Sequence, residues 1–152
     1  MNGRGEMVIE SDDVVRLRAV IGRLSRQLNV SVADVGLSPS QLSVLGSVAR
    51  RGPFGIGELA EREGINPTML SRIVGKLDDA GLISRIPHPD DGRAALVQVT
   101  TAGRHLHQRV QAQRTELLAD RLARLKPKQA AALVAALKAL EVLAAVDVEA
   151  TR

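Results

Sequence analysis

The chain has 152 residues, of which 45% are hydrophobic and 25% are charged, a balance typical of a folded globular domain and not of a disordered chain. It contains no cysteine, which excludes disulfides, thiolate metal sites and thiol-based redox sensing. Phe54 is its only Phe, Tyr or Trp, so stacking platforms for unpaired bases are missing and a single-stranded nucleic acid is disfavoured as a ligand. The formal net charge of +4 is compatible with a polyanionic partner but is a weak signal by itself.

No targeting or membrane segment is evident in the sequence. Residues 1–15 lack the apolar core and the cleavage site of a signal peptide, and no run reaches the roughly 18 apolar residues that a membrane span requires. We therefore expect a cytoplasmic protein.

Two helices are predicted in the first third of the chain. Apolar residues recur at spacings of three and four between residues 12 and 28, which is the pattern of an amphipathic helix. Residues 30–36 form a less regular connector. The next helix starts with Ser38 as its N-cap and Pro39 in its first turn, and it stops at the Gly-Pro pair at residues 52–53.

A short helix and a tight turn follow. Residues 57–63 are predicted to be helical, with Leu59 and Ala60 as the inward positions. Gly64 ends this helix in the left-handed conformation, and Ile65 is the inward-pointing residue of the turn.

The helix after this turn has a strong start signal. Asn66 is placed to be its N-cap, Pro67 its first helical residue and Gly81 its C-cap. Apolar periodicity predicts a buried stripe formed by Met69, Leu70, Ile73, Val74 and Leu77. The outward face carries Thr68, Ser71, Arg72, Gly75 and Lys76. Two helices joined by a tight turn are typical of a helix-turn-helix.

Two strand-like runs, residues 82–86 and 94–99, come directly after this helix. The segment between them, residues 87–93, consists of polar and turn-forming residues and is too long for a two-residue hairpin. It is therefore predicted to project as a wing.

Two further helices are expected after the wing. Thr100 or Thr101 caps the first, which extends to about residue 124, and a break at residues 126–128 separates it from a last helix at about 129–147. Together with the first helix of the chain they carry more apolar surface than a monomer can easily cover, which indicates pairing of two copies. The basic residues of this region are Arg104, Arg109, Arg114, Lys126 and Lys128. Two interpretations are open for them: the favoured one is a solvated helix face, and the less favoured one is a site for an anion or flanking DNA.

The outward face of the helix that starts at Pro67 suits the major groove of DNA. Arg72 can donate two hydrogen bonds to O6 and N7 of guanine, and Thr68 and Ser71 can contact bases or phosphates. Lys76, one turn further on, is expected to contact a phosphate, and the free N–H groups beside Pro67 can hold another.

The wing supplies a second candidate contact with DNA. Arg93 at its tip is expected to reach the minor groove, and Asp91 is expected to orient Arg93 through an ion pair. Acidic residues balance basic ones across residues 51–100, so DNA binding here must depend on a few well-placed cations. The same balance leaves open an alternative, a winged helix that binds a protein partner and does not read DNA sequence.

No arrangement typical of an enzyme or a metal site occurs in the sequence. It has no paired carboxylates, nucleophile–base pair or Gly-rich phosphate loop at usable spacing. His105 and His107 are two positions apart on a predicted helix and point apart, which disfavours a zinc site. With no Tyr or Trp, a ligand pocket is expected to be aliphatic. We therefore predict neither an enzyme nor a bound cofactor or metal.

These motifs resemble the MarR family of bacterial transcriptional regulators. The resemblance is close over residues 37–103 and extends to the flanking helices by pattern. The residues that carry it are Gly57-Glu58-Leu59-Ala60, the run from Asn66 to Arg72, Leu77, Gly81-Leu82-Ile83, Asp91-Gly92-Arg93, Leu96 and the run from Val99 to Gly103. It implies a mainly α fold with a small two- to three-stranded β wing. In that fold residues 37–103 form a winged helix-turn-helix DNA-binding domain, and residues 10–36 and 104–148 form a helical dimerisation region.

The resemblance also implies a function. Members of the family are usually repressors that bind a pseudo-palindromic operator in double-stranded DNA as homodimers, and small anionic phenolic compounds often release them. An anionic or aromatic small molecule is thus an expected effector. The predicted DNA-binding residues are Pro67, Thr68, Ser71, Arg72, Lys76, Asp91 and Arg93.

Overall fold

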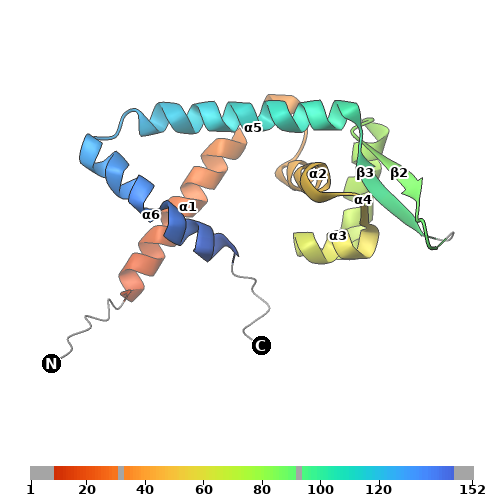
Figure 1. Ribbon diagram of the computed structural model, residues 1–152, viewed down its shortest axis with the longest axis horizontal. Helices are drawn as coiled ribbons and strands as arrows, with labels where there is room; N and C mark the ends of the chain where they lie inside the picture. Colours follow the sequence, from red (N-terminus) through yellow and green to blue (C-terminus); the bar gives the residue numbers. More distant parts are fainter. Residues whose placement is uncertain (1–8, 31–32, 92–93, 146–152) are drawn as a thin grey trace. The chain divides into compact units, whose positions relative to one another are not determined.

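The computed structural model describes residues 9–30, 33–91 and 94–145. Its elements are, in order, α1 (Ser11–Val30), the short 3-10 helix η1 (Ala33–Val35), α2 (Pro39–Arg51), β1 (Phe54–Gly55), α3 (Ile56–Glu63), α4 (Pro67–Asp79), β2 (Ile83–Pro87), β3 (Ala95–Val99), α5 (Thr101–Leu122) and α6 (Pro127–Ala145) (Figure 1). The predicted mainly α fold with a small β wing is confirmed.

The chain divides into two compact units, Met1–Thr115 and Glu116–Arg152. The first contains α1 to α4, the sheet and the beginning of α5, and the second contains the end of α5 and α6. The functional division into a DNA-binding domain at residues 37–103 and a dimerisation region on either side of it stays a prediction. Among the described residues, no helix combines the length and the hydropathy that are needed to cross a bilayer.

The local signals at the start of α2 act as predicted. Ser38 is the N-cap, and its Oγ accepts a hydrogen bond of 3.2 Å from the backbone N–H of Gln41. The Gln41 side chain accepts in return a bond of 2.7 Å from the backbone N–H of Ser38, which completes a capping box. Pro39 occupies the first turn, where its missing N–H is not needed.

One hydrophobic core joins α2, α3, α4 and the sheet. Its buried members come from every one of these elements: Val44, Leu45, Val48, Phe54, Leu59, Ala60, Leu70, Ile73, Val74, Leu77, Ile83 and Val97. The core fixes how the helix-turn-helix sits on α2 and on the strands, because close-packed side chains leave few alternative arrangements.

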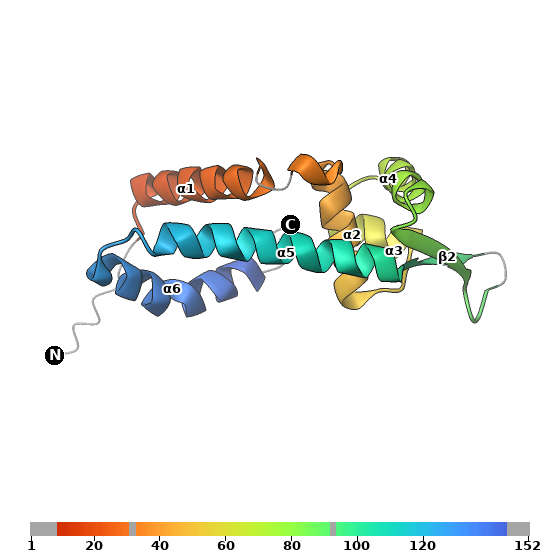
Figure 2. The ribbon, with the colours of Figure 1, turned by 90° about the horizontal axis from the view of Figure 1, so that it is seen from above.

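The sheet has three antiparallel strands in the order β1-β3-β2. The ladder between β2 and β3 runs from Ile83 opposite Val99 to Pro87 opposite Ala95, and both views show this hairpin extending beyond α2, α3 and α4 (Figures 1 and 2). The short strand β1 pairs with the other edge of β3. The sequence holds no specific signal for β1, because this strand is only two residues long.

The buried stripe of α4 was predicted with one wrong member. Leu70, Ile73, Val74 and Leu77 are buried, but the Met69 side chain is 48% exposed. Met69 lies at the edge of the apolar stripe in the first turn of the helix, where the neighbouring start of α2 leaves its side chain about half exposed. Periodicity identifies the apolar face of the helix, but it does not show which residues of that face the neighbouring elements cover.

The last helix also differs from its prediction. The sequence Lys-Pro-Lys at residues 126–128 indicates a break with a new helix from residue 129, but α6 already starts at Pro127. Proline is favoured in the first helical turn, and the Gln129 side chain accepts a hydrogen bond of 3.1 Å from the backbone N–H of Lys126. The described helix ends at Ala145, and the predicted end at residue 147 lies outside the described residues.

Thr100 links the end of α4 to the start of α5. Its Oγ1 donates a hydrogen bond of 2.7 Å to the backbone carbonyl of Gly81 and accepts one of 3.0 Å from the backbone N–H of Gly103. Its own N–H donates to the carbonyl of Leu82 at 3.1 Å. Of the two predicted caps, Thr100 and Thr101, the structure therefore selects Thr100.

Candidate nucleic-acid interface

The corner between α3 and α4 forms as the sequence predicts. Gly64 ends α3 in the left-handed conformation, with φ 65° and ψ 30°, which glycine adopts without steric cost. Ile65 is half-buried and packs against the core. The side chain of Asn66 then accepts a hydrogen bond of 2.8 Å from the backbone N–H of Met69, and Pro67 starts α4. These contacts hold the first turn of α4 in place.

The face of α4 opposite the core is polar and open. It carries exposed side chains at Thr68, Ser71, Arg72 and Lys76, as predicted. Among the described residues, neither Arg72 nor Lys76 has an ion-pair partner. Both cations are therefore available to an external anion.

Part of the acidic charge near α4 is engaged elsewhere. Glu63, at the end of α3, accepts hydrogen bonds from the hydroxyls of Ser43 and Ser47 on α2. Asp78, near the end of α4, lies 3.7 Å from Nε of Arg85 on β2. These contacts direct two of the acidic side chains away from Arg72 and Lys76.

The predicted wing is described only in part. The two strands are paired as far as Pro87 and Ala95, and the backbone N–H of Ala94 donates to the carbonyl of Asp91 at 3.0 Å. Asp91 is exposed. Arg93 and its predicted ion pair with Asp91 lie outside the described residues.

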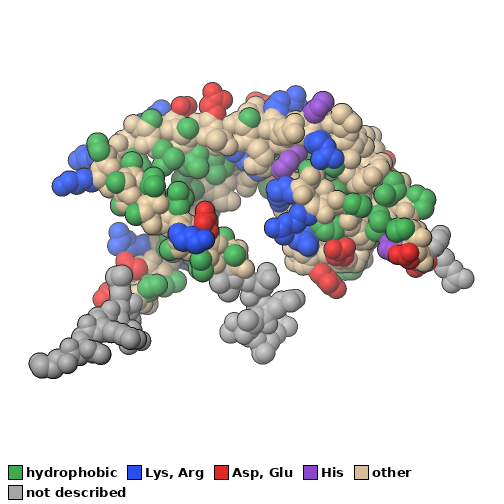
Figure 3. Space-filling model, in the orientation of Figure 1, with side chains coloured by type: hydrophobic (Ala, Val, Ile, Leu, Met, Phe, Trp, Pro, Cys, Tyr) green, Lys and Arg blue, Asp and Glu red, His purple; other side chains and the backbone are tan. Residues whose placement is uncertain are grey.

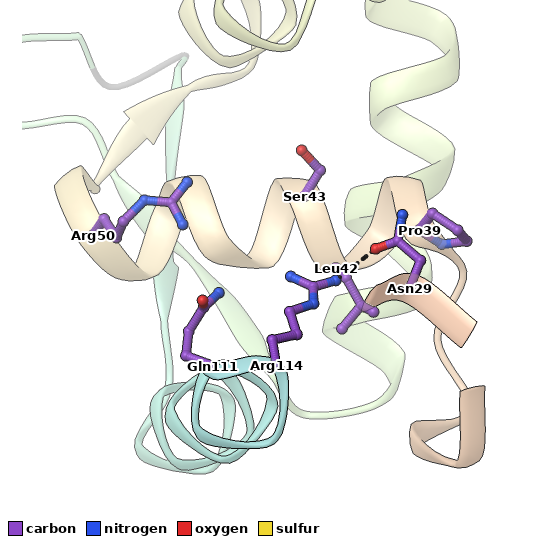
Figure 4. A pocket seen from close by; sticks show the side chains of 7 residues that line it. All are labelled: Asn29, Pro39, Leu42, Ser43, Arg50, Gln111 and Arg114. Carbon is purple, nitrogen blue, oxygen red and sulfur yellow. Dashed lines mark hydrogen bonds between the residues drawn. The ribbon is translucent and has the colours of Figure 1, made fainter. Parts of the chain in front are cut away.

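A second polar site, which was not predicted from the sequence, lies in the first compact unit (Figure 4). It is a cleft of about 250 Å³ lined by Asn29, Pro39, Leu42, Ser43, Arg50, Gln111 and Arg114. We call it the arginine cleft. Its residues come from α1, α2 and α5, and α5 is far from the other two helices in the sequence, so no local motif could have indicated it. Most of its lining is polar, unlike the aliphatic lining that we expect of a ligand pocket, and that expectation stays a prediction.

Arg114 is not on a solvated helix face, which was the favoured interpretation for it. Its side chain is half-buried, and Nη2 donates a hydrogen bond of 2.8 Å to Oδ1 of Asn29. Its Nε is buried and has no hydrogen-bond partner in the described part of the chain. By contrast, Arg104, Arg109, Lys126 and Lys128 are exposed, as expected for a solvated face.

The surroundings of the arginine cleft are positively charged. Burial lowers the pKa of His107 on α5, and the charges of Arg50 and Arg114 lower this pKa further. A Cβ atom on Gly46 would lie 2.9 Å from Nη1 of Arg50 and 3.3 Å from Cε1 of His107. The bare backbone of Gly46 thus leaves room for the Arg50 guanidinium and for the imidazole ring of His107, whose neutral form the lowered pKa favours.

Comparison with known proteins agrees with this architecture. The profile of the MarR family matches residues 37–95. An HTH-type transcriptional regulator of Mycobacterium bovis is 41% identical over 109 residues, which cover 72% of this chain and 76% of that protein. The HTH-type transcriptional repressor MdtR of Bacillus subtilis is 28% identical over 109 residues, which cover 72% of this chain and 70% of MdtR.

Solved structures extend the similarity to the whole fold. The crystal structure of RV1404 from Mycobacterium tuberculosis is 29% identical and has a TM-score of 0.79, with 93% of this chain and 99% of that chain covered. Wild-type MarR from E. coli shares the fold, with 23% identity, a TM-score of 0.71 and coverage of 88% and 98%. The family consists of regulators and not of enzymes. This chain belongs to the MarR family of winged helix-turn-helix, DNA-binding transcriptional regulators.

Proposed function

We propose that the protein is a cytoplasmic repressor that binds a pseudo-palindromic operator in double-stranded DNA as a homodimer. The observation that carries this proposal is the exposed polar face of α4, which lies opposite a buried apolar core and carries two cations without an ion-pair partner among the described residues. The name of the related MdtR supports repression as the sign of regulation. Family membership favours DNA over a protein partner as the ligand of this face.

Each predicted contact has a defined role in the proposal. Arg72 reads guanine through two hydrogen bonds, and Thr68 and Ser71 contact bases or phosphates. Lys76 binds a phosphate, as does the start of α4 at Pro67. In the wing, Arg93 enters the minor groove and Asp91 orients it.

The proposed dimer is supported by apolar surface on two helices. On α1 the exposed apolar side chains are Val14, Val15, Leu17, Val20, Ile21 and Leu24, and on α6 they are Leu133, Val134, Leu137, Val142 and Leu143. Figure 3 shows hydrophobic side chains at the surface along α6. Apolar patches of this kind mark interfaces, and two copies place two α4 helices on two half-sites of the operator.

Two measurements on the purified protein test the proposal. Selection of bound fragments from genomic DNA is expected to recover sequences that share one pseudo-palindromic motif. Sedimentation equilibrium at micromolar concentration is expected to give twice the chain mass of 16.2 kDa. A monomeric mass contradicts the homodimer, and absence of DNA binding even at low salt favours the protein-interaction alternative.

We also propose that a small aromatic anion releases the operator by binding in the arginine cleft. Arg50 and Arg114 line the cleft together with uncharged side chains, and no carboxylate lines it. Arginine binds carboxylates through paired, charge-assisted hydrogen bonds, so a hydroxybenzoate suits the lining.

Titration calorimetry with a hydroxybenzoate as the probe tests this site. The double variant Arg50→Gln, Arg114→Gln is expected to bind the probe at least 100-fold more weakly, because it loses two hydrogen bonds to charged groups and each contributes about 1.5–3 kcal/mol. The matched control is Arg51→Gln, which removes a neighbouring charge outside the cleft lining. Equal probe affinity in the double variant and the wild type refutes the assignment of the cleft.

A further inference from the structure

A second groove lies between the start of α2 and the outward face of α4. It has a volume of about 300 Å³, and we call it the α2–α4 groove. The N-cap Ser38 and the α2 residues Ser40 and Gln41 line one side, and α4 lines the other with Met69, Arg72, Ile73 and Lys76. No local pattern in the sequence joins these two segments, and Met69 was predicted to lie in the core.

The lining of the α2–α4 groove combines cationic, hydroxyl and apolar groups. Arg72 and Lys76 supply positive charge, and none of the described residues that line the groove is a carboxylate. Ser38 and Gln41 are occupied by the capping box, whereas the Ser40 hydroxyl has no hydrogen-bond partner among the described residues. Met69 adds an apolar surface that is about half exposed.

We propose that the α2–α4 groove seats the sugar–phosphate backbone of one DNA strand while α4 lies in the major groove. In this arrangement Ser40 and Lys76 bind a phosphate from the two sides of the groove, and Met69 packs against the deoxyribose beside it. The inference rests on the proposed DNA-binding function and extends it to α2.

Two features favour this occupant over a small molecule or a protein. The first feature is charge: the described residues that line the groove include two cations and no carboxylate, which complements a polyanion. Continuity is the other: Arg72 and Lys76 belong both to this groove and to the outward face of α4. A DNA strand that contacts the outward face of α4 therefore has its backbone at the edge of the groove. There its phosphates can meet the cationic side chains, and its apolar deoxyribose can meet Met69.

The test measures the affinity of the full-length protein for a selected operator and for a random duplex, over a range of salt concentrations. Ser40→Glu is expected to weaken binding to both duplexes at least 10-fold and by similar factors, because a backbone contact carries no sequence information. Met69→Ala is expected to weaken both about 3- to 10-fold. Lys76→Gln is expected to reduce the slope of log K against log salt by about 1.

Controls separate this inference from a loss of folding and from failure of the function itself. Gln113→Glu adds the same negative charge at an exposed position of α5 and is expected to bind like the wild type. Ser40→Ala, which adds no charge, is expected to fold normally and to weaken both duplexes about 2- to 5-fold.

Two results overturn the groove proposal while the proposed function survives. One is that both Ser40 variants bind like Gln113→Glu while Arg72→Ala loses the operator. The other is that Met69→Ala changes the preference at a single base pair, which makes Met69 a base contact. If the wild type itself binds no duplex at low salt, the proposed function fails and the groove proposal fails with it.

Discussion

Replacement of Arg72 by alanine is expected to weaken operator binding by about 1–3 kcal/mol and to relax the sequence preference at one base pair of each half-site. The physical reason is that a guanidinium with two hydrogen bonds to one guanine loses both when the side chain is removed. Arg72 is exposed on the outward face of α4 and has no competing ion pair in the described part of the chain. Gel-shift titration against operators with each base pair replaced in turn measures both effects.

Two matched variants separate base reading from simple loss of charge. Arg93→Ala is expected to weaken binding by a similar amount and to leave the major-groove preference intact, because a minor-groove contact distinguishes bases poorly. Arg51→Ala removes an exposed arginine at the end of α2 and is expected to have little effect. If Arg72→Ala binds every operator like the wild type, the assignment of α4 as the reading helix is wrong.

The substitution Gly103→Ala is expected to destabilise the fold by about 3 kcal/mol, which is near the upper end for overpacked sites. A Cβ atom at Gly103 would overlap the carbonyl oxygen of Leu82 and would lie 3.0 Å from Cγ2 of Val99. The first of these is a backbone atom, so relief requires α5 to move away from the link that Thr100 makes with the end of α4. Urea unfolding measures the change, and a decrease in Tm of about 6–12 °C is expected with it.

The matched control is Gly75→Ala on α4. A Cβ atom there meets no atom within 4 Å, and alanine is favoured over glycine in a helix by about 0.5–1 kcal/mol. This variant is therefore expected to be slightly more stable than the wild type. A Gly103→Ala protein as stable as the wild type contradicts the close packing of α5 on the sheet.

Much of the fold was predictable because its helix ends have local causes. Ser38, Gly64, Asn66 and Thr100 act on backbone groups within a few residues, so their roles are evident from sequence alone. The buried stripe of α4 follows from periodicity for the same reason. The predicted DNA-binding residues of α4 lie on the helix face opposite that stripe, so periodicity is enough to identify them.

The predicted start of the last helix was wrong by two residues, but the two errors in side-chain environment concern contacts between distant segments. Met69 was assigned to the core, although the start of α2 leaves its side chain about half exposed. Arg114 was assigned to a solvated face, although it hydrogen-bonds Asn29 across 85 positions of sequence. In both cases the helix that contains the residue was predicted correctly, but the residue's surroundings, which come from another element, were not.

The sequence by itself determined the helix-turn-helix, the wing strands and the polar face of α4, because capping, periodicity and turn chemistry act over a few residues. Only the tertiary structure decided where α2 stands relative to α4 and which arginines gather between α1, α2 and α5. Those arrangements depend on how side chains from separate segments fill a common core, and no single stretch of the chain contains that information.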